Sequence, residues 1–369
     1  MRLAKSFFVY VTMSVCCLSA AAEAPPAELS ADIDPKTGVA WFDARDIGVE
    51  GKAWLDTEAF YDRLPARAKG IVRDPVWNLS RHSAGLCVRF ATDASSIDVR
   101  WKLTSDRLAM AHMPATGVSG VDLYVHTSDG WRWLGVGQPT AITNEAKLVS
   151  GIPPKRRDYS LYLPLYNGVE SVEIGIPRES HLWPEQVAAD HAKPIVFWGT
   201  SITQGGCASR PGMVHTAILG RRLARPIINL GFSGNGRMEP EVARLVAEID
   251  AAAFVIDCLP NLKHEAVAER AQPLVNLLRE KHAQTPILLV EDRSYTNAFL
   301  LKEQQNRNRQ SREALRTAFE ELQQAGVPAL YYLPGDGLLG SDGEDTVDGS
   351  HPTDLGFLRQ ANAFEPVLR

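Results

Sequence analysis

Apolar and polar residues alternate in several short segments of the first half of the chain. The segments 86–90, 96–101, 121–125 and 171–176 place apolar side chains at every second position, which is the period of a strand with one buried face. Turn signals such as Asn167-Gly168 lie between these segments. Short strands joined by regular turns predict a β-sandwich of jelly-roll type over residues 38–185.

The pattern changes near residue 190. Continuous apolar runs occupy 194–198, 227–230, 253–257 and 286–290. Helical periodicity fills the stretches between and after them, at roughly 213–224, 239–248, 263–282 and 308–325. Strands that are apolar throughout and alternate with helices predict a parallel sheet covered on both faces. We therefore expect a three-layer α/β/α domain over residues 190–369, with the boundary between about 178 and 192, where prolines and polar residues cluster.

The N-terminus has the order of a secretory signal. Two basic residues, Arg2 and Lys5, precede an apolar stretch from Phe7 to about Leu18 and the small residues 19–22. The stretch is too short to span a bilayer as a helix. We expect a signal peptide over residues 1–22, a linker over 23–37 and a secreted or periplasmic mature chain.

A lipid anchor is the alternative for this segment, because Cys16 and Cys17 lie inside its apolar part. The preceding residues, Met13-Ser14-Val15, fit a lipoprotein signal poorly, so we do not expect lipidation. No other segment is long and apolar enough to be a transmembrane helix.

Composition excludes some partners. The formal net charge is −5 and shows no basic bias, which argues against nucleic acid because a phosphate backbone calls for clustered Lys and Arg. Eight tryptophans and nine tyrosines are core residues by default, although aromatic faces also suit sugar rings.

Three cysteines remain beyond the signal segment: Cys87, Cys207 and Cys258. An odd number allows at most one disulfide and leaves one thiol free. No pair has zinc-like spacing, and we expect Cys87 and Cys258 to be small buried residues.

Polar residues follow the apolar runs where the predicted strands end, which is where an open parallel sheet binds ligands. Ser201 follows the first run, Gly234 the second and Asn261 the third, while Asp348 and His351 lie near the C-terminus. Each has an ordinary alternative. The serine could be a helix cap, the glycine a plain turn residue, the asparagine a cap of the helix from about 263, and Asp348 a turn residue.

Together these residues meet the needs of acyl transfer. Serine catalysis requires a base, a carboxylate that orients the base, and donors for the developing oxyanion. We predict Ser201 as nucleophile, His351 as base and Asp348 as its partner. The backbone amides of Ser201 and Gly234 and the side chain of Asn261 are the predicted oxyanion donors.

Four further residues are candidate substrate contacts. Asp292 and Arg293 follow the fourth apolar run, and Gln204 and Arg210 lie close to the nucleophile in sequence. The polar loop that begins at Asp292 is long, and long loops on a rigid scaffold often bind ligands. A solvated connection and an ordinary helix entry are the alternatives.

These strings resemble the SGNH (GDSL-like) hydrolases over roughly residues 193–365. Gly199-Thr200-Ser201, Gly234, Asn261 and Asp348-x-x-His351 look like the four blocks of that family, in the family's order. Gly120-Val121-Asp122-Leu123-Tyr124 is similar to the Gly-x-Asp-Leu-Tyr string of a bacterial esterase branch with an N-terminal β domain. The resemblance implies a three-layer hydrolase domain, no metal or other cofactor, and double-displacement ester hydrolysis.

Two departures from the family pattern stand out. Thr200 occupies a position where many members have Asp. The glycine usual before the asparagine block is absent, with Cys258 or Leu259 in its place and Leu262 following Asn261.

We expect the substrate to be an acylated carbohydrate, and the protein to be an exported carbohydrate O-acetyl esterase. Export and an accessory β domain favour this hypothesis by analogy. A lipid, thioester or general short-chain acyl esterase is the first alternative. A glycan-binding protein with a silent hydrolase domain is the alternative from another class.

Overall fold

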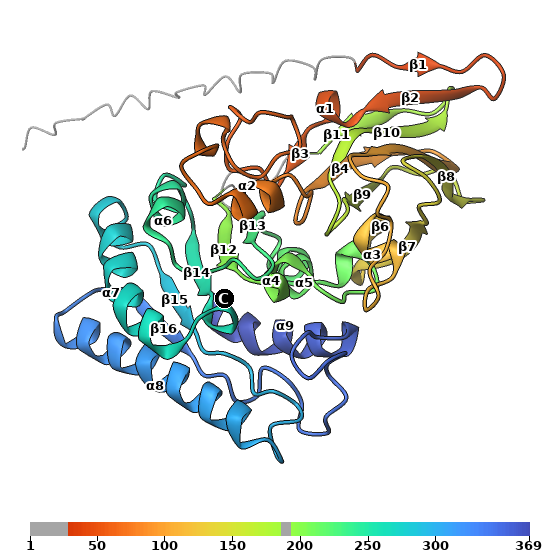
Figure 1. The fold of residues 1–369 in the computed structure, drawn as a ribbon. Helices are drawn as coiled ribbons and strands as arrows, with labels where there is room; N and C mark the ends of the chain where they lie inside the picture. Colours follow the sequence, from red (N-terminus) through yellow and green to blue (C-terminus); the bar gives the residue numbers. More distant parts are fainter. Residues whose placement is uncertain (1–28, 186–192) are drawn as a thin grey trace, which may run out of the picture.

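The computed structural model describes residues 29–185 and 193–369. In these ranges the chain forms two antiparallel sheets and then one parallel sheet (Figure 1). The predicted signal peptide (1–22) and the first part of the predicted linker lie outside the described residues. The last part of that linker is a strand, because Asp32 and Ile33 pair with Trp41 and Ala40 of the next strand.

The antiparallel sheets have the orders β1-β2-β10-β5-β8 and β11-β4-β9-β6-β7, with β3 paired to β4. Their strands are β1 (Asp32–Ile33), β2 (Val39–Asp43), β3 (Val49–Glu50), β4 (Cys87–Thr92), β5 (Ser96–Leu103), β6 (Val121–Thr127), β7 (Gly130–Gly137), β8 (Thr143–Ser150), β9 (Arg157–Tyr162), β10 (Val169–Pro177) and β11 (Leu182–Pro184). Alternate residues of both sheets, such as Trp101 and Leu161, meet in one buried core. The predicted β-sandwich is confirmed.

The parallel sheet has the order β13-β12-β14-β15-β16. Its strands are β12 (Ile195–Gly199), β13 (Ile227–Gly231), β14 (Ala253–Asp257), β15 (Ile287–Val290) and β16 (Leu330–Leu333), and all their pairings are parallel. The chain order reverses beside β12, which creates a crevice at the carboxyl ends of β12, β13 and β14.

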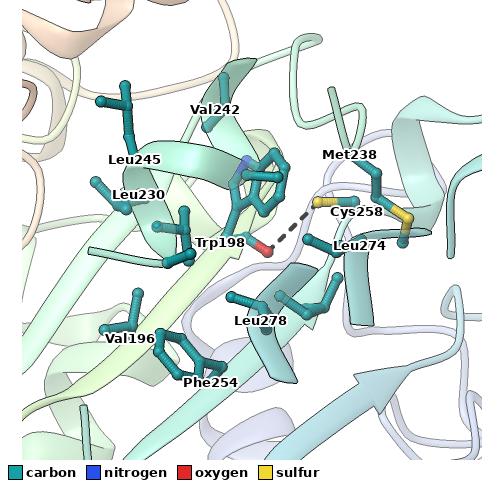
Figure 2. Close-up of a cluster of buried hydrophobic side chains, with 14 of the residues drawn as sticks. Val196, Trp198, Leu230, Met238, Val242, Leu245, Phe254, Cys258, Leu274 and Leu278 are labelled. Atoms are coloured by element: carbon teal, nitrogen blue, oxygen red, sulfur yellow. Dashed lines mark hydrogen bonds between the residues drawn. The ribbon is translucent and has the colours of Figure 1, made fainter. Parts of the chain in front are cut away.

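Helices cover both faces of this sheet, so the predicted three-layer domain is confirmed. Val196 and Trp198 pack on one face with Phe254 and the helices α6 and α7 (Figure 2), whereas Ile195 and Phe197 pack on the other face with α5 and α9. The helices of this domain are α4 (Ser201–Gln204), α5 (His215–Leu223), α6 (Pro240–Val246), α7 (His264–Lys281), α8 (Lys302–Gln324) and α9 (Asp354–Leu368). Helix α8 begins at Lys302, so the loop after β15 is shorter than predicted.

A segment of the N-terminal half packs directly on the α/β domain. It contains α2 (Asp74–Ser80), and its Trp54 and Leu64 lie in the same buried cluster as Leu230 of β13. The buried guanidinium of Arg63 donates hydrogen bonds of 2.9 Å to the carbonyl oxygens of both Asn229 and Gly231. The two halves therefore form a continuous packed body, and the sandwich stands beside the carboxyl end of β12 and β13.

Candidate active site

Ser201 lies at the turn where β12 gives way to helix α4. Thr200 is the N-cap of this helix, and its hydroxyl accepts a hydrogen bond from the Ile202 amide at 3.3 Å. The alternative that Ser201 serves only as the cap is therefore wrong. The Ser201 side chain is left to face His351, and 6% of the residue's surface is exposed.

The structure brings Ser201, His351 and Asp348 into one hydrogen-bonded chain. Ser201 Oγ lies 2.8 Å from His351 Nε2, and His351 Nδ1 lies 2.7 Å from Asp348 Oδ2. The other oxygen of Asp348 accepts hydrogen bonds from the amides of His351 (2.8 Å) and Ser350 (3.1 Å). Asp348 is thus both a turn residue and the partner of the imidazole.

These contacts keep the Asp348 carboxyl ionised. Partial burial raises its pKa, but the hydrogen bonds from the His351 amide, the His351 ring and the Ser350 amide outweigh that effect and leave the pKa below the ordinary value. An ionised carboxylate accepts the Nδ1 proton and so presents Nε2 of His351 to Ser201 as a proton acceptor.

The predicted oxyanion donors come from three neighbouring loops. Gly234 follows β13 in a left-handed conformation (φ 69°) that favours glycine. Asn261 follows β14, and its Oδ1 accepts a hydrogen bond of 3.1 Å from the Gly236 amide. This bond fixes the amide group so that its Nδ2 remains a donor. Within the described residues, the amides of Ser201 and Gly234 and the Nδ2 of Asn261 form no hydrogen bond.

The capping alternative for Asn261 is wrong. Helix α7 has Lys263 as its N-cap, and no side chain caps it. The asparagine instead joins the loop after β14 to the loop after β13.

Gln204, a predicted substrate contact, has a structural role. It is fully buried, and its Nε2 lies 3.1 Å from both His82 Nδ1 and the Leu165 carbonyl oxygen. Its Oε1 accepts a hydrogen bond from the Ser233 amide at 3.0 Å. All its polar atoms are engaged, so it anchors the loop that holds Gly234 to the N-terminal domain.

Arg210 also has a structural role, and its partners belong to the Gly-x-Asp-Leu-Tyr string. Its Nη1 donates to Asp122 Oδ2 at 2.7 Å and to the Tyr124 hydroxyl at 2.5 Å. Asp122 is fully buried and accepts a further bond from the Gly212 amide at 2.9 Å. Burial raises the pKa of Asp122 and the charge of Arg210 opposes that rise. The string thus fastens the sandwich to the segment that follows Ser201.

Asp292 and Arg293, predicted as substrate contacts, are paired with other residues of the protein. Both side chains are buried, each about 3% exposed. Arg293 pairs with the buried Asp257, including an Nη2–Oδ2 bond of 2.7 Å, and Asp292 lies 3.2 Å from Arg307. Burial raises the pKa of Asp292 to about 6 despite these cations. The two residues form an ionic network beneath the site.

Two residues of the N-terminal domain to which the sequence analysis assigned no role lie beside Ser201 and His351. The ring of His112, in the loop between β5 and β6, lies 6.1 Å from the ring of His351. Tyr166 donates a hydrogen bond of 3.2 Å to the Ser201 carbonyl oxygen. No pattern in the sequence predicts these contacts of His112 and Tyr166, because the contacts depend on how the two domains pack.

The three cysteines beyond the signal segment are free and buried, as expected for Cys87 and Cys258. Burial, with the charge of Asp348, raises the pKa of the Cys207 thiol to about 12, so this neighbour of the site is no nucleophile at neutral pH. In the described ranges, no cluster of His, Cys, Asp and Glu could hold a metal ion. None of the helices in residues 29–185 and 193–369 is both long and apolar enough to cross a bilayer.

Comparisons with known proteins agree with this architecture. Residues 192–369 match the GDSL-like lipase/acylhydrolase family, and residues 39–182 match the GxDLY family, described as the N-terminus of SGNH-hydrolase-type esterases. A protein from Bacteroides ovatus described as a GDSL-like lipase is 34% identical, with a TM-score of 0.85 over 89% of this chain and 97% of its own. No protein with a curated description matches the chain.

More distant structures share the fold. A family two carbohydrate esterase from Cellvibrio japonicus is 13% identical, with a TM-score of 0.56 over 90% of this chain and 97% of its own. A salicylyl-acyltransferase from a tetracycline biosynthetic pathway is 17% identical, with a TM-score of 0.70 over 90% of this chain and 95% of its own. The resemblance seen in the sequence is confirmed: the chain belongs to the GDSL-like lipase/acylhydrolase (SGNH) family and is an ester hydrolase with a GxDLY-type N-terminal domain.

Proposed function

We propose that this ester hydrolase is an exported carbohydrate O-acetyl esterase that works through Ser201, His351 and Asp348. The observation that supports the catalytic part is the continuous chain of short hydrogen bonds, 2.8 Å from Ser201 to His351 and 2.7 Å from His351 to Asp348. Three free donors from neighbouring loops, at Ser201, Gly234 and Asn261, support the same part.

In the first half of the proposed reaction, Ser201 Oγ attacks the ester carbonyl carbon while its proton passes to His351 Nε2. The carbonyl oxygen becomes an oxyanion, which the amides of Ser201 and Gly234 and the Asn261 Nδ2 stabilise. When the tetrahedral intermediate collapses, the bond to the alcohol oxygen breaks and His351 returns the proton to that oxygen. The alcohol leaves, and the acetyl group stays on Ser201.

Water completes the proposed cycle. His351 removes a proton from a water molecule as its oxygen attacks the acyl carbon, and the same donors stabilise the second oxyanion. The bond to Ser201 Oγ then breaks, and Oγ recovers its proton from His351. Acetic acid is released and the free enzyme is restored.

The proposal of a sugar ester rests on the surroundings of the serine. A cavity between the two domains has both apolar and polar lining residues, and its polar ones, among them Asn78, Ser105 and Ser233, can hydrogen-bond to sugar hydroxyls. The fold is shared with a family two carbohydrate esterase from Clostridium thermocellum solved with cellohexaose, which is 15% identical, with a TM-score of 0.53 over 77% of this chain and 90% of its own. The proposal of export rests on the signal-like residues 1–22.

Acetate release from acetylated xylan and from an aryl acetate tests the proposal. The wild type should act on both, and Ser201→Ala should abolish both activities. Ser128→Ala, in an exposed turn of the sandwich, is the matched control and should retain both. A series of aryl esters with longer acyl chains separates the alternatives: a steep preference for long chains, with no acetate from sugars, would refute the carbohydrate assignment.

A further inference from the structure

A cavity of about 560 Å³ lies between the sandwich and the hydrolase domain. This volume falls within the range of small-molecule sites, roughly 300–1,000 Å³. Most of its wall comes from the N-terminal domain, including Asn78, His82 and Arg107, whereas the hydrolase domain contributes Ser233 and Asn235.

The cavity adjoins the proposed reaction centre. Ser233 and Asn235 flank Gly234, one of the proposed oxyanion donors. Tyr166, another lining residue, donates its hydrogen bond to the Ser201 carbonyl oxygen. The cavity thus shares Ser233, Asn235 and Tyr166 with the surroundings of the proposed centre, and it is large enough for more than an acetyl group.

The wall is preorganised at its polar positions. Asn235 Oδ1 accepts a hydrogen bond of 2.8 Å from Arg73, and its Nδ2 donates to the Ser233 carbonyl at 2.8 Å. Arg73 is itself paired with Glu239. Burial, together with the charge of Arg63, lowers the pKa of His82 to about 4, so this wall residue is neutral near pH 7.

Arg107 is the exception on this wall. Among the described residues that line the cavity it is the single one with a charge at neutral pH. Its guanidinium has no ion pair and no hydrogen bond to another described residue, and its side chain is exposed. No carboxylate lines the cavity to balance it. An unpaired guanidinium beside neutral polar groups favours a ligand that brings its own carboxylate together with hydroxyls.

We propose that this cavity binds the sugar part of the ester and that Arg107 selects sugars that bear a carboxylate, so that acetylated uronic acids are the preferred substrates. This inference rests on the proposed function. The neighbouring polar groups of Asn78 and Ser105 would meet the sugar hydroxyls, and the guanidinium would meet the carboxylate.

The test uses the full enzyme and two matched substrates: methyl glucuronoside and methyl glucoside, each carrying one acetyl group at the same hydroxyl. They differ only in a carboxylate or a hydroxymethyl group, and the 2-, 3- and 4-acetates are each assayed for acetate release. For the wild type, we expect kcat/KM to be about tenfold higher for the acidic sugar than for the neutral one. One solvent-exposed, charge-assisted hydrogen bond contributes a difference of about this size. Arg107→Gln should bring the ratio to about one, mainly through KM, and added salt should lower the wild-type ratio.

Two controls sharpen the test. Arg107→Lys should keep part of the preference, because it retains the charge but not the planar fork. Arg132→Gln removes another exposed arginine of the sandwich, one paired with Asp129 at 3.7 Å, and should leave the ratio unchanged. Two results would overturn this inference and leave the proposed function standing. One is a wild-type ratio near one with Ser201-dependent cleavage of both sugars. The other is a ratio that Arg107→Gln does not change. Failure to deacetylate either sugar and acetylated xylan, with the aryl acetate still cleaved, would overturn both.

Discussion

Substitution of Asp348 by Asn should harm the enzyme more than substitution by Ala. Two backbone amides, those of Ser350 and His351, donate to Oδ1 of the carboxylate. In Asp348→Asn they would hold the amide oxygen in the same place. The Nδ2 of the new side chain would then face His351 Nδ1 and donate to it. The imidazole would have to carry its proton on Nε2, where it cannot accept the proton of Ser201.

The magnitudes follow from these contacts. Loss of one charge-assisted hydrogen bond, as in Asp348→Ala, is worth about 1.5–3 kcal/mol, so kcat should fall roughly 10- to 150-fold. We expect the lower part of this range, because 45% of the Asp348 side chain is exposed and a water molecule can take the place of the missing carboxylate beside His351. The wrong tautomer in Asp348→Asn should cost more, on the order of 10³-fold or above.

Steady-state hydrolysis of an aryl acetate at pH 7–8 measures both variants, with circular dichroism as the check on folding. The predicted order of kcat is wild type, then Asp348→Ala, then Asp348→Asn. If the Asn variant matched or exceeded the Ala variant, the argument that Asp348 sets the tautomer of His351 would be refuted.

Two further predictions concern stability. Asp122→Ala leaves Arg210 without its buried partner, so the free energy of unfolding should fall by about 3 kcal/mol and Tm by about 5 °C or more. The control Asp129→Ala breaks an exposed pair and should change the free energy of unfolding by less than about 1 kcal/mol. Equal effects of the two substitutions in thermal melts would contradict the anchoring role of Asp122. Asp292 has a folded-state pKa of about 6, above the unfolded value of about 3.9, so the folded protein binds this proton more tightly and loses stability as the pH rises from 4 to 6. Relative to Asp292→Asn, the wild type should lose about 2 kcal/mol over that window in urea unfolding, and a difference independent of pH would count against the assigned shift.

The sequence predicted the elements whose burial pattern is strong. All four apolar runs of the second half are strands of the parallel sheet, because strands buried on both faces must be apolar throughout. It did not predict β8 (Thr143–Ser150), an edge strand in which exposed positions alternate with partly buried ones. Helix α9 was also missed: it contains Gly356 and Pro366, and its Thr353 cap lies close in sequence to Asp348 and His351.

The candidate site, too, could be predicted only in part from the sequence. The places of Ser201, Gly234 and Asn261 were predictable because each comes soon after a strand whose carboxyl end must lie at one edge of the sheet. The surroundings of the predicted substrate contacts were not predictable, because the sequence does not show that Arg293 is neutralised by Asp257 or that Gln204 is buried. Asp122 was noticed as part of a string, but its bond to Arg210 depends on the packing of the two domains.

The central claim is that Ser201 is the nucleophile and that His351 activates it. Reaction of the folded protein with an alkyl fluorophosphonate, followed by peptide mass spectrometry, tests it most directly. We predict one label per chain on the peptide that contains Ser201, no label in Ser201→Ala, and much slower labelling in His351→Ala. A folded, ester-cleaving wild type that is labelled elsewhere, or a Ser201→Ala variant that keeps its activity, would contradict the account.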